Sequence, residues 1–176
     1  GDDTGIAGAV DGASLVIGLA GKSVNCRYTA ANRAEILRSR TQTTEALSRA
    51  IAVAKNPPAL WVNSSTATIY RHAEDRAMTE ESGDIGSGFS VEIARAWEAA
   101  LFAGELPGTA HLRGAGSGQQ RFSWIHIEDV ARIIDFLEEH PLLEGPINAS
   151  APHPVDNRNF MASIRRVLGV RFGPPT

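Results

Sequence analysis

The stretch Ser14-Leu-Val-Ile-Gly-Leu-Ala20 is apolar throughout and ends at Gly21, a pattern typical of a central strand that is buried on both faces and then enters a loop. A helical pattern follows over 32–55 and is stopped by Asn56-Pro-Pro58. Residues 59–63 then have the composition of a second buried strand, which enters a Ser/Thr-rich loop. A strand, a long helix and a strand in this order predict parallel neighbours joined by a right-handed crossover, so the fold class is α/β.

The expected helices each have one apolar face. In the helix over 32–55 this face consists of Ile36, Leu37, Thr44, Leu47, Ala50, Ile51 and Ala54. A polar, glycine-bearing surface loop over 70–88 precedes a helix over 91–102, whose inner face holds Ala94, Trp97 and Leu101. A short strand over 146–149 precedes a last helix, capped by Asn157 and ended by Gly169, which is expected to bury Phe160, Ile164, Val167 and Leu168.

The segment 116–135 joins a glycine turn, a short apolar strand and an amphipathic helix without spacers. Its helix has one apolar stripe, with Asp129 as the expected cap of the first turn and the positions Val130, Ile133, Ile134 and Leu137. His126 alternates with Ile125 and Ile127, so we expect a buried structural imidazole in preference to a catalytic one. The predicted core anchors are Trp61, Trp97 and Trp124.

The composition is that of one ordinary soluble domain, with 176 residues, 43% hydrophobic and 21% charged. A net charge of −3 with short, separated basic clusters excludes a nucleic-acid-binding surface. No apolar run is long enough to span a bilayer and no signal-peptide pattern opens the chain, so we expect no membrane association and a cytoplasmic location. Cys26 is the single cysteine, which excludes an intramolecular disulfide.

Two segments have the glycine spacing of phosphate-binding loops but lack the flanking strand and helix that such loops need. Thr4-Gly-Ile-Ala-Gly8 has Thr-Gly-x-x-Gly spacing, but only three residues precede it and no segment of helix length follows. Gly114-Ala-Gly-Ser-Gly118 precedes a strand, so no helix dipole would hold an anion there and a flexible substrate-side loop is expected. No metal site is predicted, because the candidate ligands lie in a polar loop without fixed geometry: His72, Glu74, Asp75, Glu80 and Glu81.

Several short motifs together resemble an atypical branch of the extended short-chain dehydrogenase/reductases, the epimerase family proteins. Ser64-Ser-Thr-Ala-Thr-Ile-Tyr70 is similar to a loop of nucleotide-sugar epimerases. The other motifs are Leu19-Ala-Gly21 followed by Ser39-Arg40, Trp97-Glu98, Trp124-Ile-His-Ile-Glu-Asp129 and Gly145-Pro-Ile-Asn-Ala-Ser-Ala-Pro152.

The resemblance implies a Rossmann-like doubly wound parallel sheet with a small C-terminal substrate-side region. We expect a core over 1–112 that lacks the first cofactor-binding unit, and a segment over 113–176 packed on that core. Leu112 and Arg113 also join segments that relatives separate by a strand, a substrate loop and a helix. Either the chain is truncated, or disordered segments of the full protein are missing from this sequence; we favour the second explanation, so an intact protein heavier than 18.7 kDa is expected.

The resemblance also implies a cofactor site for NADP, with NAD as the alternative. The backbone of Leu19, Ala20 and Gly21 would pass beneath the cofactor ribose, unless these residues only form a tight turn, and Ser64 and Ser65 would lie beside it. Gly18 stands where many relatives have asparagine. Thr66 is the catalytic candidate, since its hydroxyl would hydrogen-bond the reacting oxygen; the alternative is a loop hydroxyl bonded to nearby backbone. The substrate-side candidates are Tyr70, Arg113 and Arg121, with solvated surface charges as the alternative for the arginines.

The acid/base pair of the family is missing. Alignment on Glu98 puts Ser90 at the tyrosine position and Ala94 at the lysine position, and neither can move a proton as the Tyr/Lys pair does. Two functions follow. The chain is an NADP(H)-binding oxidoreductase or epimerase-like protein acting on a small molecule, with a nucleotide-sugar as one candidate, or it is a catalytically inactive dinucleotide-binding sensor or scaffold. A homodimer is an open alternative to a monomer.

Overall fold

The computed structural model describes residues 3–73, 75–104, 106, 108–114 and 121–170. The elements run in the order α1 (Asp3–Val10), β1 (Leu15–Gly18), α2 (Ala30–Val53), β2 (Leu60–Thr66), a 3₁₀ turn η1 (Ala67–Ile69), α3 (Phe89–Phe102), β3 (Thr109–Gly114), β4 (Arg121–Phe122), α4 (Ile127–Glu139), β5 (Gly145–Ala149), β6 (Val155–Asp156) and α5 (Asn157–Leu168).

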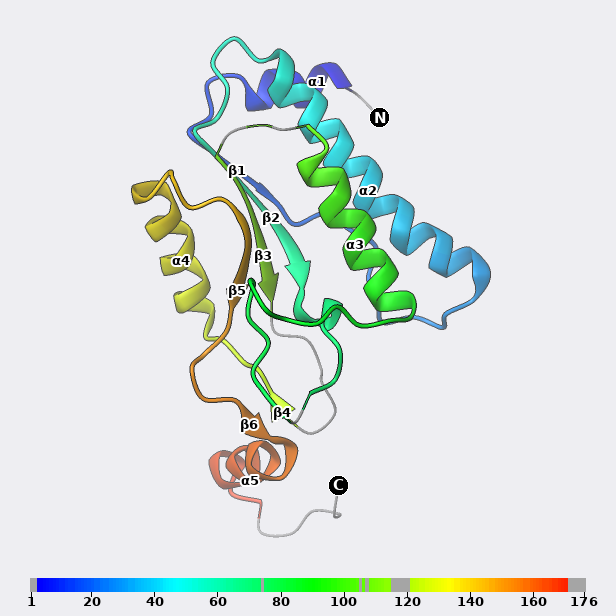
Figure 1. Cartoon of the computed structure of the whole chain (residues 1–176), viewed down its shortest axis with the longest axis vertical. Coiled ribbons are helices and arrows are strands. Elements are labelled where there is room, and N and C mark those ends of the chain that lie inside the picture. The colour runs from blue at the N-terminus through cyan, green and yellow to red at the C-terminus, as the bar shows by residue number, and fades with distance from the viewer. Residues whose placement is uncertain (1–2, 74, 105, 107, 115–120, 171–176) are drawn as a thin grey trace.

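The main sheet is parallel, as predicted. Its strand order is β1-β2-β3-β5, and β1 pairs with β2 from Leu15 opposite Leu60 to Gly18 opposite Asn63. All carboxyl ends of this sheet therefore point the same way, toward the antiparallel β4/β6 pair and α5 (Figure 1). The expected domain boundary at 112/113 falls inside β3.

Helices cover both faces of the sheet, which confirms the Rossmann-like α/β architecture. In Figure 1, α2 and α3 lie on one side and α4 on the other. Alternation along β2 explains the two cores: Leu60 and Val62 pack toward Leu137 of α4, while Trp61 packs with residues of α1, α2 and α3. Trp61 and Trp97 are buried, as predicted.

β1 lies at an edge and not in the centre of the sheet. Among the described residues it pairs with β2 alone, and Ile17 is 43% exposed. The apolar run was therefore a correct signal for a strand, but it did not show how many neighbours the strand has here. The preceding Thr4–Gly8 segment lies within helix α1, so it forms no phosphate-binding turn.

α2 confirms the predicted crossover helix and most of its inner face. Thr29 caps it by accepting a hydrogen bond from the Asn32 amide at 3.2 Å. The fully buried positions are Ile36, Thr44, Ala50 and Ile51. Leu37 was wrongly assigned to this face, since it is 37% exposed.

The segment around His126 differs from the prediction. The strand is limited to Arg121–Phe122, and His126 is the exposed N-cap of α4, whose Nδ1 accepts from the Glu128 amide at 3.2 Å. Asp129 is not the cap but lies in the first turn, where it binds Arg132. Trp124 is 43% exposed and is therefore not a buried core anchor, although its indole donates to the His153 carbonyl.

α5 is less buried than its amphipathic pattern predicted. Asp156, and not Asn157, is its N-cap, and Gly169 ends it in the left-handed conformation as expected. Val167 is 85% exposed and Leu168 is 69% exposed, and the elements that α5 contacts most are the short strands β4 and β6. No described helix combines the length and the apolar character that a membrane span needs.

Candidate functional site

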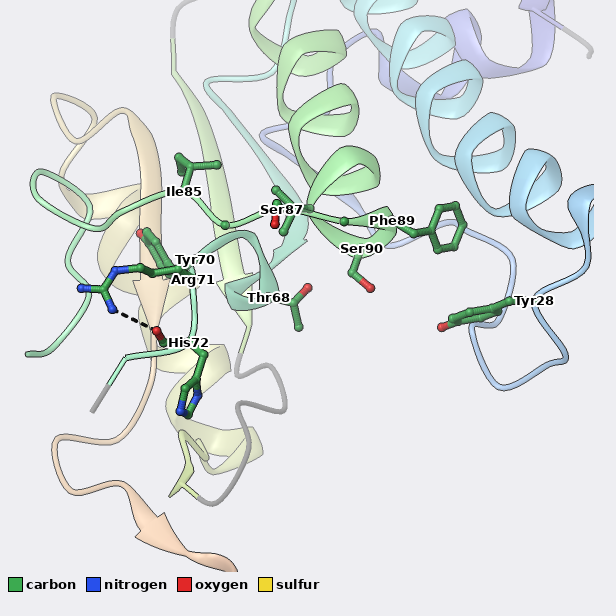
Figure 2. Close-up of a pocket in the computed structure, with 12 residues that line it drawn as sticks. Tyr28, Thr68, Tyr70, Arg71, His72, Ile85, Ser87, Phe89 and Ser90 are labelled. Atoms are coloured by element: carbon green, nitrogen blue, oxygen red, sulfur yellow. Dashed lines mark hydrogen bonds between the residues drawn. The ribbon is translucent and has the colours of Figure 1, made fainter. Parts of the chain in front are cut away.

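A pocket of about 530 Å³ opens where β2 ends and α3 begins. One wall is formed by the loop before α2 (Tyr28) and the first turn of α3 with the residues before it (Ser87, Gly88, Phe89, Ser90, Val91). The opposite wall is formed by η1 and the loop that follows (Thr68, Tyr70, Arg71, His72, Ile85, Gly86). Figure 2 shows the Ser90 side chain on the first wall and the Thr68 side chain on the opposite wall, with Tyr28 across from His72.

An aromatic cluster with a guanidinium forms the Tyr28 side of this pocket, and sequence reasoning missed it. The Tyr28 and Phe89 rings meet edge to face at 5.4 Å between centroids. The Arg33 guanidinium lies 4.4 Å from the centre of the Phe89 ring, a cation–π distance. Because the three residues come from different elements, no local spacing could have indicated the contact.

The predicted cofactor-binding turn follows β1 and lies on the surface. Leu19 is 73% exposed, and Ala20 and Gly21 are exposed too. The Ser-Arg motif of α2 holds this turn: Ser39 Oγ accepts from the Lys22 amide at 2.9 Å, and Arg40 Nη1 donates to the Lys22 carbonyl at 3.1 Å. The Arg40 side chain packs so closely on Gly21 that a Cβ there would lie 3.1 Å from its Cζ.

Ser64, Ser65 and Thr66 belong to β2, which is longer than predicted. Ser65 Oγ donates to Glu98 Oε1 at 3.0 Å, so its hydroxyl has a structural partner. Thr66 caps η1, because its Oγ1 accepts from the Thr68 amide at 3.2 Å and shares a hydrogen bond with Thr68 Oγ1 at 3.0 Å. This is the backbone-capping alternative considered for Thr66, and it leaves the hydroxyl beside the pocket residue Thr68.

Arg113 is neither an exposed ligand for substrate nor a solvated surface charge. It is 6% exposed and forms a two-pronged ion pair with Glu98, with Nε to Oε1 and Nη2 to Oε2 both at 2.8 Å. Burial acts to lower the pKa of the Arg113 guanidinium, but the hydrogen bonds and the charge of Glu98 outweigh it and the pKa lies above its ordinary value. Arg113 thus joins β3 to α3.

Tyr70 extends this ion pair toward β5. Its hydroxyl accepts a hydrogen bond from Arg113 Nη1 and donates one to Asn148 Oδ1 at 3.1 Å. The ring also lies 5.0 Å from the Arg113 guanidinium. Tyr70 lines the pocket, and its hydroxyl is already bonded to residues of two neighbouring strands.

The positions of the missing acid/base pair lie on α3. Ser90 is exposed at the pocket, whereas Ala94 is fully buried in the packing of α3 against Ile69. The sequence of α3 contains neither tyrosine nor lysine. At the position of the family tyrosine this structure therefore has the Ser90 hydroxyl in place of a phenol. At the position of the family lysine it has the Ala94 methyl group in place of an ammonium.

Other predicted residues have simpler outcomes. Arg121 lies in β4 opposite Asp156, and its side chain is outside the described part, as are residues 115–118 of the expected substrate-side loop. Within the described residues no cluster of His, Cys, Asp or Glu could hold a metal ion.

A scan against protein-family profiles finds no match to the chain. Among curated proteins it is similar to epimerase family protein YfhF of Bacillus subtilis, with 32% identity over 177 aligned positions that take in 86% of this chain and 58% of the relative. The chain thus spans less than two thirds of that relative. Because the aligned positions outnumber the matched residues of this 176-residue chain, YfhF has residues inside the matched region that this chain lacks.

Two solved structures place the fold among known proteins. The human epimerase family protein SDR39U1 (isoform 2), crystallised with NADPH, superposes with a TM-score of 0.83 at 26% identity, over 96% of this chain and 68% of that one. MoeE5 in complex with UDP-glucose and NAD superposes with a TM-score of 0.77 at 18% identity, over 96% of this chain and 68% of that one.

Proposed function

The chain belongs to the extended short-chain dehydrogenase/reductase family, in the branch of epimerase family proteins, and on this premise we propose that it is an NADP(H)-binding protein of oxidoreductase or epimerase type. The human relative is solved with NADPH, which favours NADP as the cofactor, with NAD as the alternative. The substrate is a small molecule, and the loop Ser64–Tyr70 makes a nucleotide-sugar one candidate class.

The observation that supports this most is that both proposed cofactor-binding segments lie at the carboxyl ends of adjacent parallel strands. Residues 19–21 follow β1 and residues 64–66 are the last residues of β2, and these two parallel strands are in register at Gly18 and Asn63. The turn η1 follows β2 directly and supplies Thr68 to the pocket at the start of α3. Ligands of open α/β sheets bind at the carboxyl ends of the strands, which is where these two segments lie.

The residues present fit the nicotinamide-ribose part of a dinucleotide. Residues 19–21 are exposed, which leaves room for a ribose, and the side chains of Thr68 and Ser90 line the pocket at the start of α3. The edge of β1 that no described strand covers offers hydrogen-bonding groups to a first cofactor-binding unit. We keep the division into a core over 1–112 and a substrate-side segment over 113–176 packed on that core, with β5 and α4 of the second segment completing the sheet and its core.

A bound nicotinamide would supply or accept a hydride. The protein's own contribution would be to orient the substrate: the Thr66 hydroxyl, held at the end of β2 by η1, would hydrogen-bond the reacting oxygen, and Ser90 would lie opposite. Of the described side chains that line the pocket, His72 carries the one imidazole, a group that can give and take a proton, so it is the candidate proton carrier.

A second function, a catalytically inactive dinucleotide-binding sensor or scaffold, is favoured by one observation. Ala94 is buried where the family lysine would lie, and no tyrosine stands near it on α3. Such a protein would keep the cofactor site and lose the proton transfer.

Titration of the protein with NADPH, followed by cofactor oxidation with a panel of carbonyl compounds, separates these functions. Saturable binding with oxidation supports the first, and binding without turnover on any compound supports the second. Absence of NADPH and NADH binding would contradict both.

A further inference from the structure

The two ends of the loop between η1 and α3 are hydrogen-bonded to each other. Tyr70 and Ile85 form an antiparallel bridge, the Arg71 amide donates to the Asp84 carbonyl at 2.9 Å, and the Gly86 amide donates to the Ile69 carbonyl at 2.8 Å. The two ends of residues 71–86, here called the strap, therefore lie side by side.

Ion pairs inside the strap add little to hold it on the protein. Arg71 pairs with Asp75 at 2.9 Å and with Asp84 at 2.8 Å, and Arg76 also pairs with Asp84. These pairs are solvent-exposed and join strap residues to one another, so they shape the strap without fixing it to the sheet.

The middle of the strap is bound to the sheet through Asn148, the residue before the last of β5. The Asn148 amide donates to Glu80 Oε1 at 2.5 Å, and its Nδ2 donates to the Met78 carbonyl at 3.4 Å. Its Oδ1 accepts from the Tyr70 hydroxyl at 3.1 Å. Asn148 thus holds both the middle of the strap and Tyr70, the residue before its start, using its backbone amide and both polar atoms of its side chain.

We propose that Asn148 is the positioning residue of the pocket and that it fastens the strap over the carboxyl ends of the sheet. The strap supplies Arg71, His72, Ile85 and Gly86 to the pocket wall. Loss of the Asn148 contacts frees Met78 and Glu80, and the pocket wall then opens while the sheet remains intact. This inference concerns the shape of the pocket and does not depend on the reaction or the cofactor.

Amide hydrogen exchange on the protein without cofactor tests the proposal. The matched pair is Glu80→Ala and Glu81→Ala, which remove the same charge from neighbouring exposed residues; Glu81 makes no hydrogen bond or ion pair among the described residues. Asn148→Ala removes the side-chain contacts, and Asn148→Asp keeps an acceptor for Tyr70 but removes the donor to Met78.

Glu80→Ala and Asn148→Ala are expected to speed exchange of the Arg71 and Gly86 amides by about tenfold, with α2 amides unchanged, because local opening governs the exchange of such segments. Asn148→Asp is expected to have an intermediate effect, and Glu81→Ala none. Unchanged exchange in Glu80→Ala, or equal acceleration in Glu80→Ala and Glu81→Ala, would overturn the proposal. Since Glu80 is exposed, this test stands even if the Asn148 variants fold poorly. The NADPH titration tests the proposed function independently, so a failure of one proposal can be told apart from a failure of the other.

Discussion

Asn63 on β2 fills the space that a side chain at Gly18 on β1 would need. The two residues are paired in the parallel ladder, and a Cβ at position 18 would collide with Asn63 Oδ1. Asn63 is 2% exposed, and its Nδ2 donates to the Ser64 carbonyl at 3.0 Å. Many relatives have an asparagine at the position of Gly18. In this protein the side-chain amide at that place in the sheet comes from Asn63 of β2.

Gly18→Ala is expected to destabilise the protein by about 1 to 3 kcal/mol, because the added methyl overpacks a buried contact. In an Asn63→Ala background the same change should cost less than about 1 kcal/mol, since the colliding atom is gone. Chemical denaturation of the four proteins of this double-mutant cycle measures the coupling. Equal costs in both backgrounds would show that the two side chains do not compete for space.

Tryptophan burial gives a second prediction. Trp61→Ala should cost about 3 to 5 kcal/mol through cavity formation, because Trp61 is 2% exposed. Trp124→Ala should cost clearly less, on the order of 1 kcal/mol, since Trp124 is 43% exposed and its main specific contact is one hydrogen bond. Thermal or denaturant unfolding compares the two identical substitutions, and a larger loss for Trp124 would contradict the structure.

The Arg113–Glu98 pair predicts a non-additive effect. Glu98→Met leaves a buried guanidinium without its counter-charge and should cost about 3 to 5 kcal/mol. The double variant Glu98→Met with Arg113→Met should lose less than the sum of the single variants, because no buried charge is left unpaired. Additive losses in denaturant unfolding would indicate that the two side chains act independently.

The strap aspartates give a pH prediction. Hydrogen bonds from Arg71 lower the pKa of Asp75 and of Asp84 below the ordinary value of 3.8, and Arg76 adds to the effect on Asp84. A lowered folded pKa means that the pairs stabilise the strap above pH 3.8 and are lost as the pH falls through the folded value. Carboxyl ¹³C titration should give midpoints below 3.8 for both, and Arg71→Gln should raise them; midpoints at or above 3.8 in the parent protein would contradict the contacts.

The sequence was a good guide where burial on a regular element decides the structure. The apolar runs at 14–20 and 59–63 predicted β1 and β2, because buried parallel strands need apolar side chains on both faces. The inner face of α3 was predicted from its spacing for the same reason, and Ala94, Trp97 and Leu101 are buried.

The sequence was a poor guide where distant residues meet. Nothing near Arg113 in the sequence indicates its partner Glu98, which lies on another element, so the arginine was expected at the surface. The amphipathic pattern of α5 shows which face is apolar but not how much protein covers it, and Val167 is 85% exposed. The strap contacts of Asn148 span 68 and 70 residues along the chain and have no local pattern.

The most direct measurement of the central claim compares NADPH affinity in Leu19→Glu and Val53→Glu. Leu19 is 73% exposed and Val53 is 74% exposed, so each variant adds one surface carboxylate at little cost to folding. Of the two residues, only Leu19 lies in the proposed cofactor turn. Charge repulsion with the cofactor phosphates should weaken binding by about tenfold or more in Leu19→Glu and leave Val53→Glu like the parent protein. Equal affinity in the two variants, or a parent protein that binds no NADPH, would contradict the account.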